Sequence, residues 1–211
     1  MQRWFWYFIC YSFLGFLLEV LFARAIRSDK PDRKCFCLLP LCPVYGLGMA
    51  AILALPPGVL ARPGLLFLCG GALATAVEYA TGYFYEKAAR VRFWDYSQLP
   101  LQIHGRVCLP FSLAWGLLAV GVVGGLHPYV DALAGAIPLF WLPPAALLVL
   151  ADGACTLWLL RRAGTTDVLR WGRHAARRAG AADSPCAPVP RPEAGRPFPR
   201  RTGRGGEGEW S

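Results

Sequence analysis

Charged side chains are scarce in this chain, because Asp, Glu, Lys and Arg together make up only 17% of its 211 residues. A soluble domain normally carries about 25% charged residues. The hydrophobic fraction is 55%, and the apolar residues gather in runs that approach the roughly 20 residues needed to cross a bilayer core. These runs do not alternate between apolar and polar residues, which excludes the strand pattern of a membrane β-barrel. The composition therefore predicts an all-α, polytopic membrane bundle.

The sequence also lacks the short motifs of common catalytic sites. It has no H-E-x-x-H zinc motif, no serine elbow and no G-x-x-x-x-G-K-[ST] phosphate-binding loop. We therefore expect no enzymatic activity, no cofactor and no ATP hydrolysis by the chain itself through such a loop. Among the eight cysteines, Cys35, Cys37 and Cys42 form one close group. This spacing is only weak support for metal binding or palmitoylation, and we expect no metal site.

Five apolar runs are long enough to predict membrane spans: 4–26, 38–60, 65–86, 108–127 and 138–160. A signal peptide is the competing interpretation of the first run, but Glu19 interrupts its apolar region, which favours a retained helix. The second run contains several Pro and Gly residues, so we expect it to be kinked or partly re-entrant. Residues 1–160 are thus expected to form the transmembrane domain.

The basic residues predict the orientation in the membrane. Lys and Arg are concentrated after the first, third and fifth runs, which predicts that the N-terminus lies outside and the C-terminus in the cytoplasm. Residues 161–211 hold eleven Arg and five acidic residues, with many Pro and Gly and no apolar periodicity. We expect this tail to be disordered. Topology then accounts for the net charge of +9, and nucleic acid is not an expected partner.

Three acidic residues lie inside the apolar runs, where a charge costs about 2.5–3.5 kcal/mol. Glu19, Glu78 and Asp152 each lie about 10–12 Å from the cytoplasmic end of their run, at 1.5 Å per helical residue. This common depth predicts that the three carboxylates share one water-accessible pocket, with Arg106 as their best partner and Arg24 or Arg92 as alternatives. The pocket could be a structural salt-bridge cluster or a site for a cation, a proton or a polar substrate, and Asp152 is expected to be structural.

Two stripes of small and polar residues support an inward orientation of these acids. The third run carries one stripe at helical spacing, and the first run carries a shorter one that ends at Glu19. The members of the longer stripe are Gly71, Thr75, Glu78, Gly82 and Glu86, and those of the shorter are Ser12, Gly15 and Glu19. We expect both stripes to face neighbouring helices rather than lipid.

The polar segment FWDYSQLPLQIHGR, residues 93–106, lies between the third and fourth runs. Its aromatic residues are of the kind that anchor at the head-group level. Asp95 and Ser97 are suitable caps for a short helix. Three roles are open for this segment: an interfacial anchor, a lid over the acidic pocket, or a coupling element that contacts an ATPase.

Six stretches of the chain occur in an order that resembles a known family. They are YSFLGFLLEV (11–20), LPLCPVYGLG (39–48), VEYATGYFYEK (77–87), FWDYS (93–97), HGRVCL (104–109) and LHP (126–128). Together they are similar to the bacterial family of putative ABC-transporter type IV permeases over about residues 5–128.

The resemblance implies a permease-like subunit of the bacterial inner membrane, surrounded by membrane lipid, with a separate ATPase subunit and a homo-oligomer as the implied partners. Seven residues that occur in the family pattern are the binding or coupling candidates: Glu19, Tyr45, Glu78, Glu86, Trp94, Asp95 and Arg106. The alternative is a structural or regulatory membrane protein that does not transport and whose buried salt-bridge cluster holds the bundle together.

Overall fold

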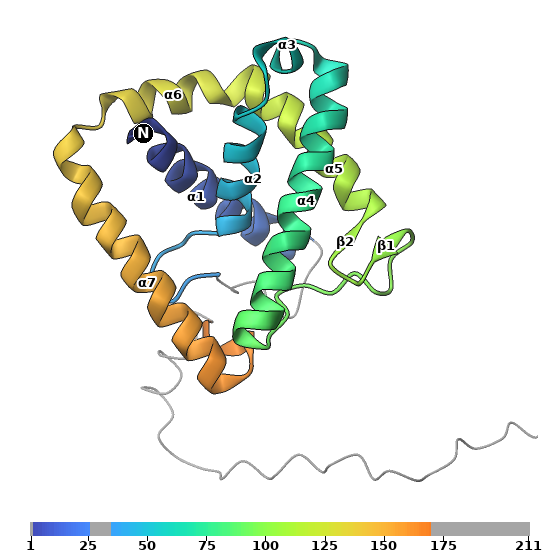
Figure 1. The fold of residues 1–211 in the computed structure, drawn as a ribbon, viewed down its shortest axis with the longest axis vertical. Helices are drawn as coiled ribbons and strands as arrows, with labels where there is room; N and C mark the ends of the chain where they lie inside the picture. Colours follow the sequence, from blue (N-terminus) through green and yellow to red (C-terminus); the bar gives the residue numbers. More distant parts are fainter. Residues whose placement is uncertain (1, 26–34, 170–211) are drawn as a thin grey trace, which may run out of the picture.

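The computed structural model describes residues 2–25 and 35–169 of the chain. The basic residues of the first loop, Cys186 and the tail beyond Leu169 lie outside these ranges, and so do the expectations that concern them. The described part is mostly helical, which confirms the expected all-α bundle (Figure 1).

Four helical segments are long and apolar enough to cross a membrane: Gln2–Ala25, Pro63–Ala89, Leu109–Ala136 and Leu139–Ala163. The first is α1 and the second is α4. The third joins α5 (Leu109–Gly121), the π-helix η1 (Val122–Leu126) and α6 (His127–Ala136). The fourth joins the 3-10 turn η2 (Leu139–Trp141) and α7 (Leu142–Ala163). A last 3-10 turn, η3 (Thr166–Leu169), follows α7.

The second expected span, 38–60, does not form one continuous helix. Residues 35–42 are non-helical, α2 covers only Pro43–Leu53, and a single turn, α3 (Pro57–Leu60), follows it. Eleven residues of α-helix extend about 16 Å, roughly half of a 30 Å bilayer core. Because the ring of Pro43 fits the first turn of a helix and disrupts an interior turn, α2 begins there. The described residues therefore contain four helices of spanning length rather than five.

Glycines allow α1 and α2 to pack at very short range. A Cβ atom at Gly15 would lie 2.2 Å from Cγ of Tyr45, and one at Gly46 would lie 2.2 Å from Oγ of Ser12. The N–H of Cys42 donates to the carbonyl oxygen of Ser12 at 2.9 Å. The first turn of α2 thus lies beside the middle of α1, and the short stripe of α1 faces α2 as expected.

The segment before α2 is held by α7. Asp152, which is 2% exposed, accepts hydrogen bonds from the backbone N–H groups of Leu38 and Leu39 at 2.7–3.1 Å. Thr156, one turn later on α7, accepts the N–H of Cys37 at 2.9 Å. Non-helical backbone inside a membrane protein is tolerated where protein groups satisfy it. Asp152 therefore binds the backbone of this segment, and its structural role stays a prediction. The prediction that it shares a pocket with Glu19 and Glu78 is wrong, because its hydrogen-bond partners lie in a different part of the bundle.

The chain bends sharply between α5 and α6. Figure 1 shows α6 running across one end of the bundle, above the start of α1. The bend coincides with η1, whose VVGGL sequence contains two glycines, and π-helical turns and glycine pairs are common causes of such bends. Gly121 and Gly125 have the G-x-x-x-G spacing that often pairs helices in membranes, but no atom lies within 4 Å of a Cβ placed on either of them. They do not pair helices within the described chain.

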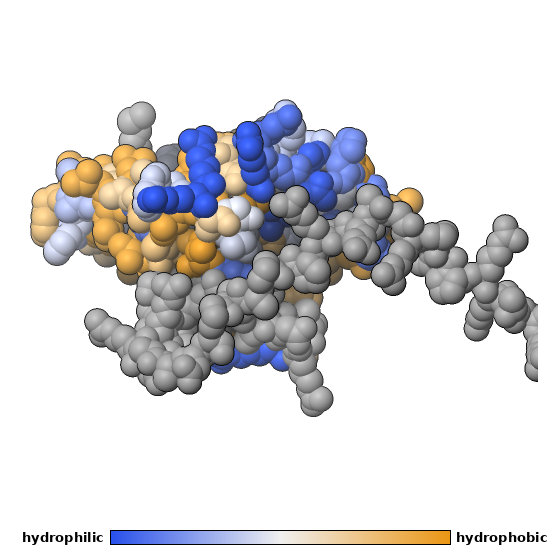
Figure 2. All heavy atoms as spheres, turned by 90° about the horizontal axis from the view of Figure 1, so that it is seen from below, coloured by the Kyte–Doolittle hydropathy of each residue, from blue (hydrophilic) through white to orange (hydrophobic). Residues whose placement is uncertain are grey.

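The α6 end of the bundle is the end where α3 and α6 lie, and the loop end is the end where α4 and α7 finish (Figure 1). Figure 2 views the molecule from the loop end and shows hydrophilic residues gathered over part of it, with hydrophobic residues toward the rim. Five basic residues on this end are exposed: Lys87, Arg90, Arg92, Arg161 and Arg162.

Candidate functional site

Glu78 is the centre of a buried polar cluster between α4, α5 and the loop that joins them. Its side chain is 5% exposed. The indole Nε1 of Trp115 donates to one carboxylate oxygen at 3.0 Å, and the hydroxyl of Tyr96 donates to the other at 3.0 Å. The sequence predicts Arg106 as the best partner of this acid. The structure instead gives Glu78 two neutral donors, which solvate the carboxylate without neutralising it.

Glu19 lies beside this cluster, on the α1 side of α2. The hydroxyl of Tyr45 donates to Glu19 Oε1 at 2.7 Å, while the rest of the Glu19 side chain is exposed. The ring of Tyr45 lies over Gly15 and its centroid is 4.9 Å from that of Trp115. Two carboxylates are thus connected through an aromatic pair at the first turn of α2. We call Glu19, Tyr45, Glu78, Tyr96 and Trp115 the inner polar site.

Arg106 forms a second cluster with Glu86, nearer to the loop end. Its Nη2 and Nε atoms donate to Glu86 Oε2 at 2.5 and 3.2 Å, and its Nη1 donates to the hydroxyl of Tyr79 at 2.9 Å. The guanidinium also lies 5.0 Å from the Tyr79 ring centroid and 5.2 Å from that of Tyr83. The hydrogen bond with Glu86 raises the pKa of Arg106, so the side chain stays charged at any physiological pH. These contacts are typical of an ion pair that fixes one element against another.

Arg92 completes this second cluster from the exposed side. Its Nε lies 3.0 Å from Glu86 Oε1, and its Nη1 lies 3.7 Å from Asp95 Oδ2. Asp95 is exposed, and its Oδ1 accepts the N–H of Ser97 at 3.0 Å. This hydrogen bond, with a smaller contribution from Arg92, lowers the pKa of Asp95. Asp95 therefore stays ionised and stabilises a turn rather than the helix that its sequence position suggests.

The segment between α4 and α5 packs inward rather than lying along the membrane surface. Phe93 is 4% exposed and packs with Leu160 of α7 and with Tyr85. Trp94 Nε1 donates to the carbonyl oxygen of Arg106 at 2.8 Å, beside Gly82. Burial, together with the neighbouring Glu78, raises the pKa of Tyr96. Because the rings find buried partners, the expected role as head-group anchors does not describe these three aromatic residues.

A two-stranded hairpin replaces the expected short helix. Strands β1 (Gln102–Ile103) and β2 (Val107–Cys108) pair antiparallel across a turn in which His104 and Gly105 have positive φ values of 53° and 69°. Gln102 Oε1 accepts the N–H of Gly105 at 2.6 Å, and the Gly105 carbonyl accepts the N–H of Tyr96 at 2.8 Å. The glycine therefore allows the turn that returns the chain to α5 and positions Tyr96.

The structure distributes the seven sequence candidates over two adjacent clusters. Glu19, Tyr45 and Glu78 belong to the inner polar site, and Glu86, Trp94, Asp95 and Arg106 belong to the neighbouring ion-pair cluster. Trp115 is not among the residues that the sequence predicts, because it lies in an apolar run and gives no signal of a polar role. In the ranges 2–25 and 35–169, no group of three or more His, Cys, Asp or Glu residues is placed to hold a metal ion.

A family model for putative ABC-transporter type IV proteins matches residues 6–156. The chain belongs to this family. The match extends beyond the stretch that resembles the family by sequence motifs and includes most of α7 with Asp152. No curated protein and no solved structure matches the chain. The family name, together with the apolar helices, describes an ABC-transporter-type membrane protein, and the roles of single residues stay predictions.

In this member of the ABC-transporter type IV family, we expect Arg106→Gln to lower the free energy of unfolding clearly more than Arg92→Gln does. The change leaves Glu86, which is 19% exposed, without its best partner in a partly buried place. Arg92→Gln is the matched control, because the Arg92 side chain is 51% exposed and surface ion pairs contribute only about 0–1 kcal/mol. Equilibrium unfolding in mixed micelles measures both, and equal effects would contradict the assignment of Arg106 as the main partner.

Proposed function

We propose that this chain is the membrane-embedded subunit of an ATP-driven transporter and that the inner polar site binds the transported solute. The observation that supports this proposal is the environment of Glu78. In the described part of the chain, this buried carboxylate has no cationic partner and only neutral donors. An uncompensated acid inside a membrane protein is costly and attracts positive charge. The site therefore favours a cation or a proton.

The aromatic walls of the site narrow the class of solute further. The rings of Tyr45 and Trp115 lie beside the two carboxylates, and the ring of Tyr96 stacks on Phe111 with centroids 4.8 Å apart. Aromatic faces next to carboxylates attract organic ammonium groups, because the ring face is electron-rich and the carboxylate supplies the charge. A small organic cation fits this chemistry better than an anion does.

The segment 93–106 is the element that we assign to gating. Tyr96 is held by backbone contacts to Gly105, and its hydroxyl covers one oxygen of Glu78. Arg106, at the other end of the segment, is fixed to Glu86 on α4. A displacement of the segment would uncover Glu78 toward the loop end. This geometry favours a lid role for the segment. If a partner protein contacts the exposed side of the lid, its movement would be coupled to the opening of the inner polar site.

The exposed basic residues of the loop end support a cytoplasmic position for that end. Positively charged residues flank spans on the cytoplasmic side of bacterial membranes. Lys87, Arg90 and Arg92 follow α4, and Arg161 and Arg162 end α7. We therefore propose an inner-membrane protein with its N-terminus outside, in which a separate ATPase subunit contacts the loop end.

A structural role for the polar residues is the second candidate. It is favoured by the Arg106 cluster, in which Glu86 is paired with Arg106 and Arg92, and Arg106 also donates a hydrogen bond to Tyr79. Such a cluster holds α4 against the start of α5 without needing a ligand. A non-transporting membrane protein would use both clusters in this way.

The Glu78→Gln variant distinguishes the two candidates. Gln keeps the shape of the side chain but removes the negative charge, so we expect ATP hydrolysis by the complex with its ATPase subunit to fall at least tenfold. The unfolding temperature should change by only a few degrees. The measurement needs the tagged full chain, copurified with the ATPase and reconstituted in liposomes. A variant that loses stability but keeps full ATP hydrolysis would favour the structural role.

Tyr96→Phe tests the lid separately. The change removes the hydroxyl that donates to Glu78, and we expect ATP hydrolysis to lose its dependence on transported solute. Tyr129→Phe is the control, because Tyr129 is 75% exposed at the α6 end of the bundle.

The Asp95→Ala variant loosens the turn from Asp95 to Ser97 that contains Tyr96. Unchanged stability and unchanged ATP hydrolysis in that variant would contradict both the lid and the coupling roles. Failure of any ATPase to copurify would contradict the transporter assignment itself.

A further inference from the structure

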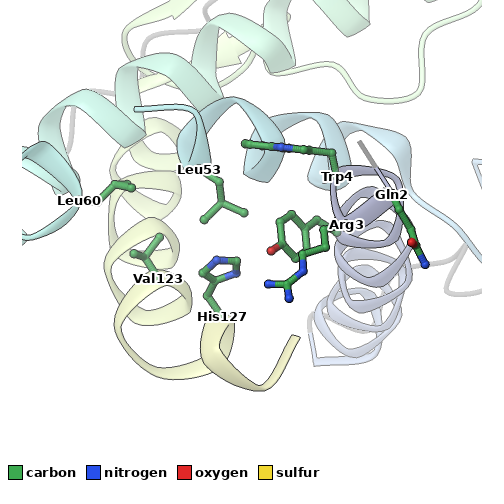
Figure 3. Close-up of a pocket in the computed structure, with 8 residues that line it drawn as sticks. Gln2, Arg3, Trp4, Leu53, Leu60, Val123 and His127 are labelled. Carbon is green, nitrogen blue, oxygen red and sulfur yellow. The ribbon is translucent and has the colours of Figure 1, made fainter. Parts of the chain in front are cut away.

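A cavity of about 530 Å³ lies at the α6 end (Figure 3). It is at the last residue of α2, whereas the inner polar site is at the first turn of that helix. Its walls come from the first turns of α1, the last residue of α2, the last residue of α3, η1 and the start of α6. The volume falls within the range of about 300–1,000 Å³ that is usual for small-molecule sites. The cavity is therefore large enough to hold a ligand or part of one.

The cavity has an apolar side and a polar side. Figure 3 shows Leu53, Leu60 and Val123 on one side, Arg3 on the other, and the ring of His127 between them. Aliphatic walls exclude a fully hydrated ion, and a guanidinium with an imidazole disfavours a purely apolar ligand. The arrangement matches a molecule that has an anionic head and an apolar chain.

The cationic side of the cavity is held in place by residues of α6. Arg3 Nη1 donates to Asp131 Oδ1 at 2.8 Å, and the hydroxyl of Tyr7 donates to the same oxygen. A Cβ on Gly135 would lie 3.2 Å from Arg3 Nη2, so the glycine makes room for the guanidinium. Asp131 does not line the cavity, and it engages one of the five N–H groups of Arg3. The other N–H groups can serve a ligand.

His127 adds a second oriented group. Its Nδ1 is hydrogen-bonded to the hydroxyl of Tyr11 at 2.9 Å, and the Tyr7 ring packs edge-on against it with centroids 5.2 Å apart. Its other ring nitrogen makes no hydrogen bond to the described residues. The ring is therefore fixed in orientation while one nitrogen stays available to a ligand in the cavity.

The depth of the cavity suits the head-group region of a bilayer. Arg3 and Trp4 belong to the first turn of the spanning helix α1, and α6 crosses the bundle at the same end. Arg and Trp at the end of a span lie at the boundary between hydrocarbon and water. We propose that the cavity binds a phosphate-headed amphiphile, with the phosphate on Arg3 and His127 and the acyl chain against Leu53, Leu60 and Val123.

Binding of a fluorescent phosphatidylglycerol to the purified full chain tests this proposal. We expect Arg3→Gln to raise the dissociation constant at least tenfold. Arg3→Lys, which keeps the charge, should raise it about threefold or less. Val123→Phe fills the apolar side and should also weaken binding. Arg24→Gln is the matched control, because Arg24 is an exposed arginine at the opposite end of the same helix, and it should bind like the unchanged chain.

Two competitors separate the sources of the phosphate. Unlabelled phosphatidylglycerol should displace the probe, whereas diacylglycerol with the same chains and inorganic phosphate at millimolar concentration should not. Equal displacement by inorganic phosphate would mean a free-anion site, and equal displacement by diacylglycerol would mean a site for chains alone. Either result, or unchanged binding in a folded Arg3→Gln variant, would overturn the proposal. None of these outcomes depends on ATP hydrolysis, so they are independent of the transporter assignment.

Discussion

Replacing Asp152 by Ala should lower the free energy of unfolding by about 3 kcal/mol. The carboxylate accepts the backbone N–H groups of Leu38 and Leu39, and both would lose their partner in a buried part of the membrane domain. Each unsatisfied buried donor costs about 1–3 kcal/mol, and water cannot replace the acceptor in hydrocarbon. Equilibrium unfolding of the full chain in mixed micelles provides the measurement.

Two further variants make the Asp152 result interpretable. Asp152→Asn keeps one acceptor oxygen, so it should recover part of the loss and cost about 1 kcal/mol. Leu150→Ala, on the same helix, is the control for a shortened side chain, because Leu150 is 71% exposed and should change stability by less than about 0.5 kcal/mol. A destabilisation by Asp152→Ala no larger than that of Leu150→Ala would show that α7 does not hold the non-helical segment.

The second large effect is expected for Gly46→Ala, which should cost about 3 kcal/mol. A Cβ there would lie 2.2 Å from Ser12 Oγ and 2.6 Å from the backbone oxygen of Phe8. A side-chain atom can rotate away, but the backbone oxygen can move only with α1. Overpacking of this kind typically costs about 1–3 kcal/mol, and the backbone contact places Gly46 at the upper limit.

A double-mutant cycle measures how much of this cost comes from Ser12. Ser12 Oγ is buried without a hydrogen-bond partner in the described residues, so Ser12→Ala alone should be nearly neutral. The double variant Ser12→Ala/Gly46→Ala should be about 1 kcal/mol more stable than Gly46→Ala alone. The rest of the cost should remain, because the added Cβ still clashes with the backbone oxygen of Phe8. Gly64→Ala is the control in an open position, because no atom lies within 4 Å of the added Cβ. Equal tolerance at Gly46 and Gly64 would mean that α1 and α2 do not pack as closely as described.

The Gly46 contact also matters for the inner polar site. Tyr45 precedes Gly46 in the first turn of α2, and its hydroxyl reaches Glu19 across Gly15. A separation of α1 from α2 would therefore break the link between Glu19 and the aromatic wall. We expect Gly46→Ala to reduce any solute-dependent activity along with stability, whereas Asp152→Ala acts through the segment before α2.

Most of the secondary structure could be predicted from the pattern of apolar residues. The first, third and fifth runs match α1, α4 and the η2–α7 segment to within a few residues. The predicted fourth run, 108–127, corresponds to α5 with η1 and stops where the chain bends into α6. The second run was harder, because residues 38–42 are as apolar as a helix but belong to backbone that Asp152 and Thr156 satisfy from another part of the chain.

The stripes of the candidate site were predictable and their partners were not. Helical spacing correctly placed Gly71, Glu78, Gly82 and Glu86 on one face of α4, which packs against α5 and the loop before it. The pairing of Arg106 with Glu86 instead of Glu78 depends on a hairpin and a glycine turn at Gly105. The common depth of the acids along their spans also predicted that Asp152 joins Glu19 and Glu78. That prediction failed because depth does not determine which side of the bundle an acid faces.

The sequence by itself determined that this is a helical membrane protein with acidic side chains inside its spans, because apolar length and the cost of buried charge are local properties of the chain. Only the tertiary structure decided which group solvates each acid: Trp115 and Tyr96 for Glu78, Arg106 for Glu86, and backbone N–H groups for Asp152. These partners are 18 to 114 residues apart in the chain. Their contacts follow from helix packing and loop geometry, which no short sequence window contains.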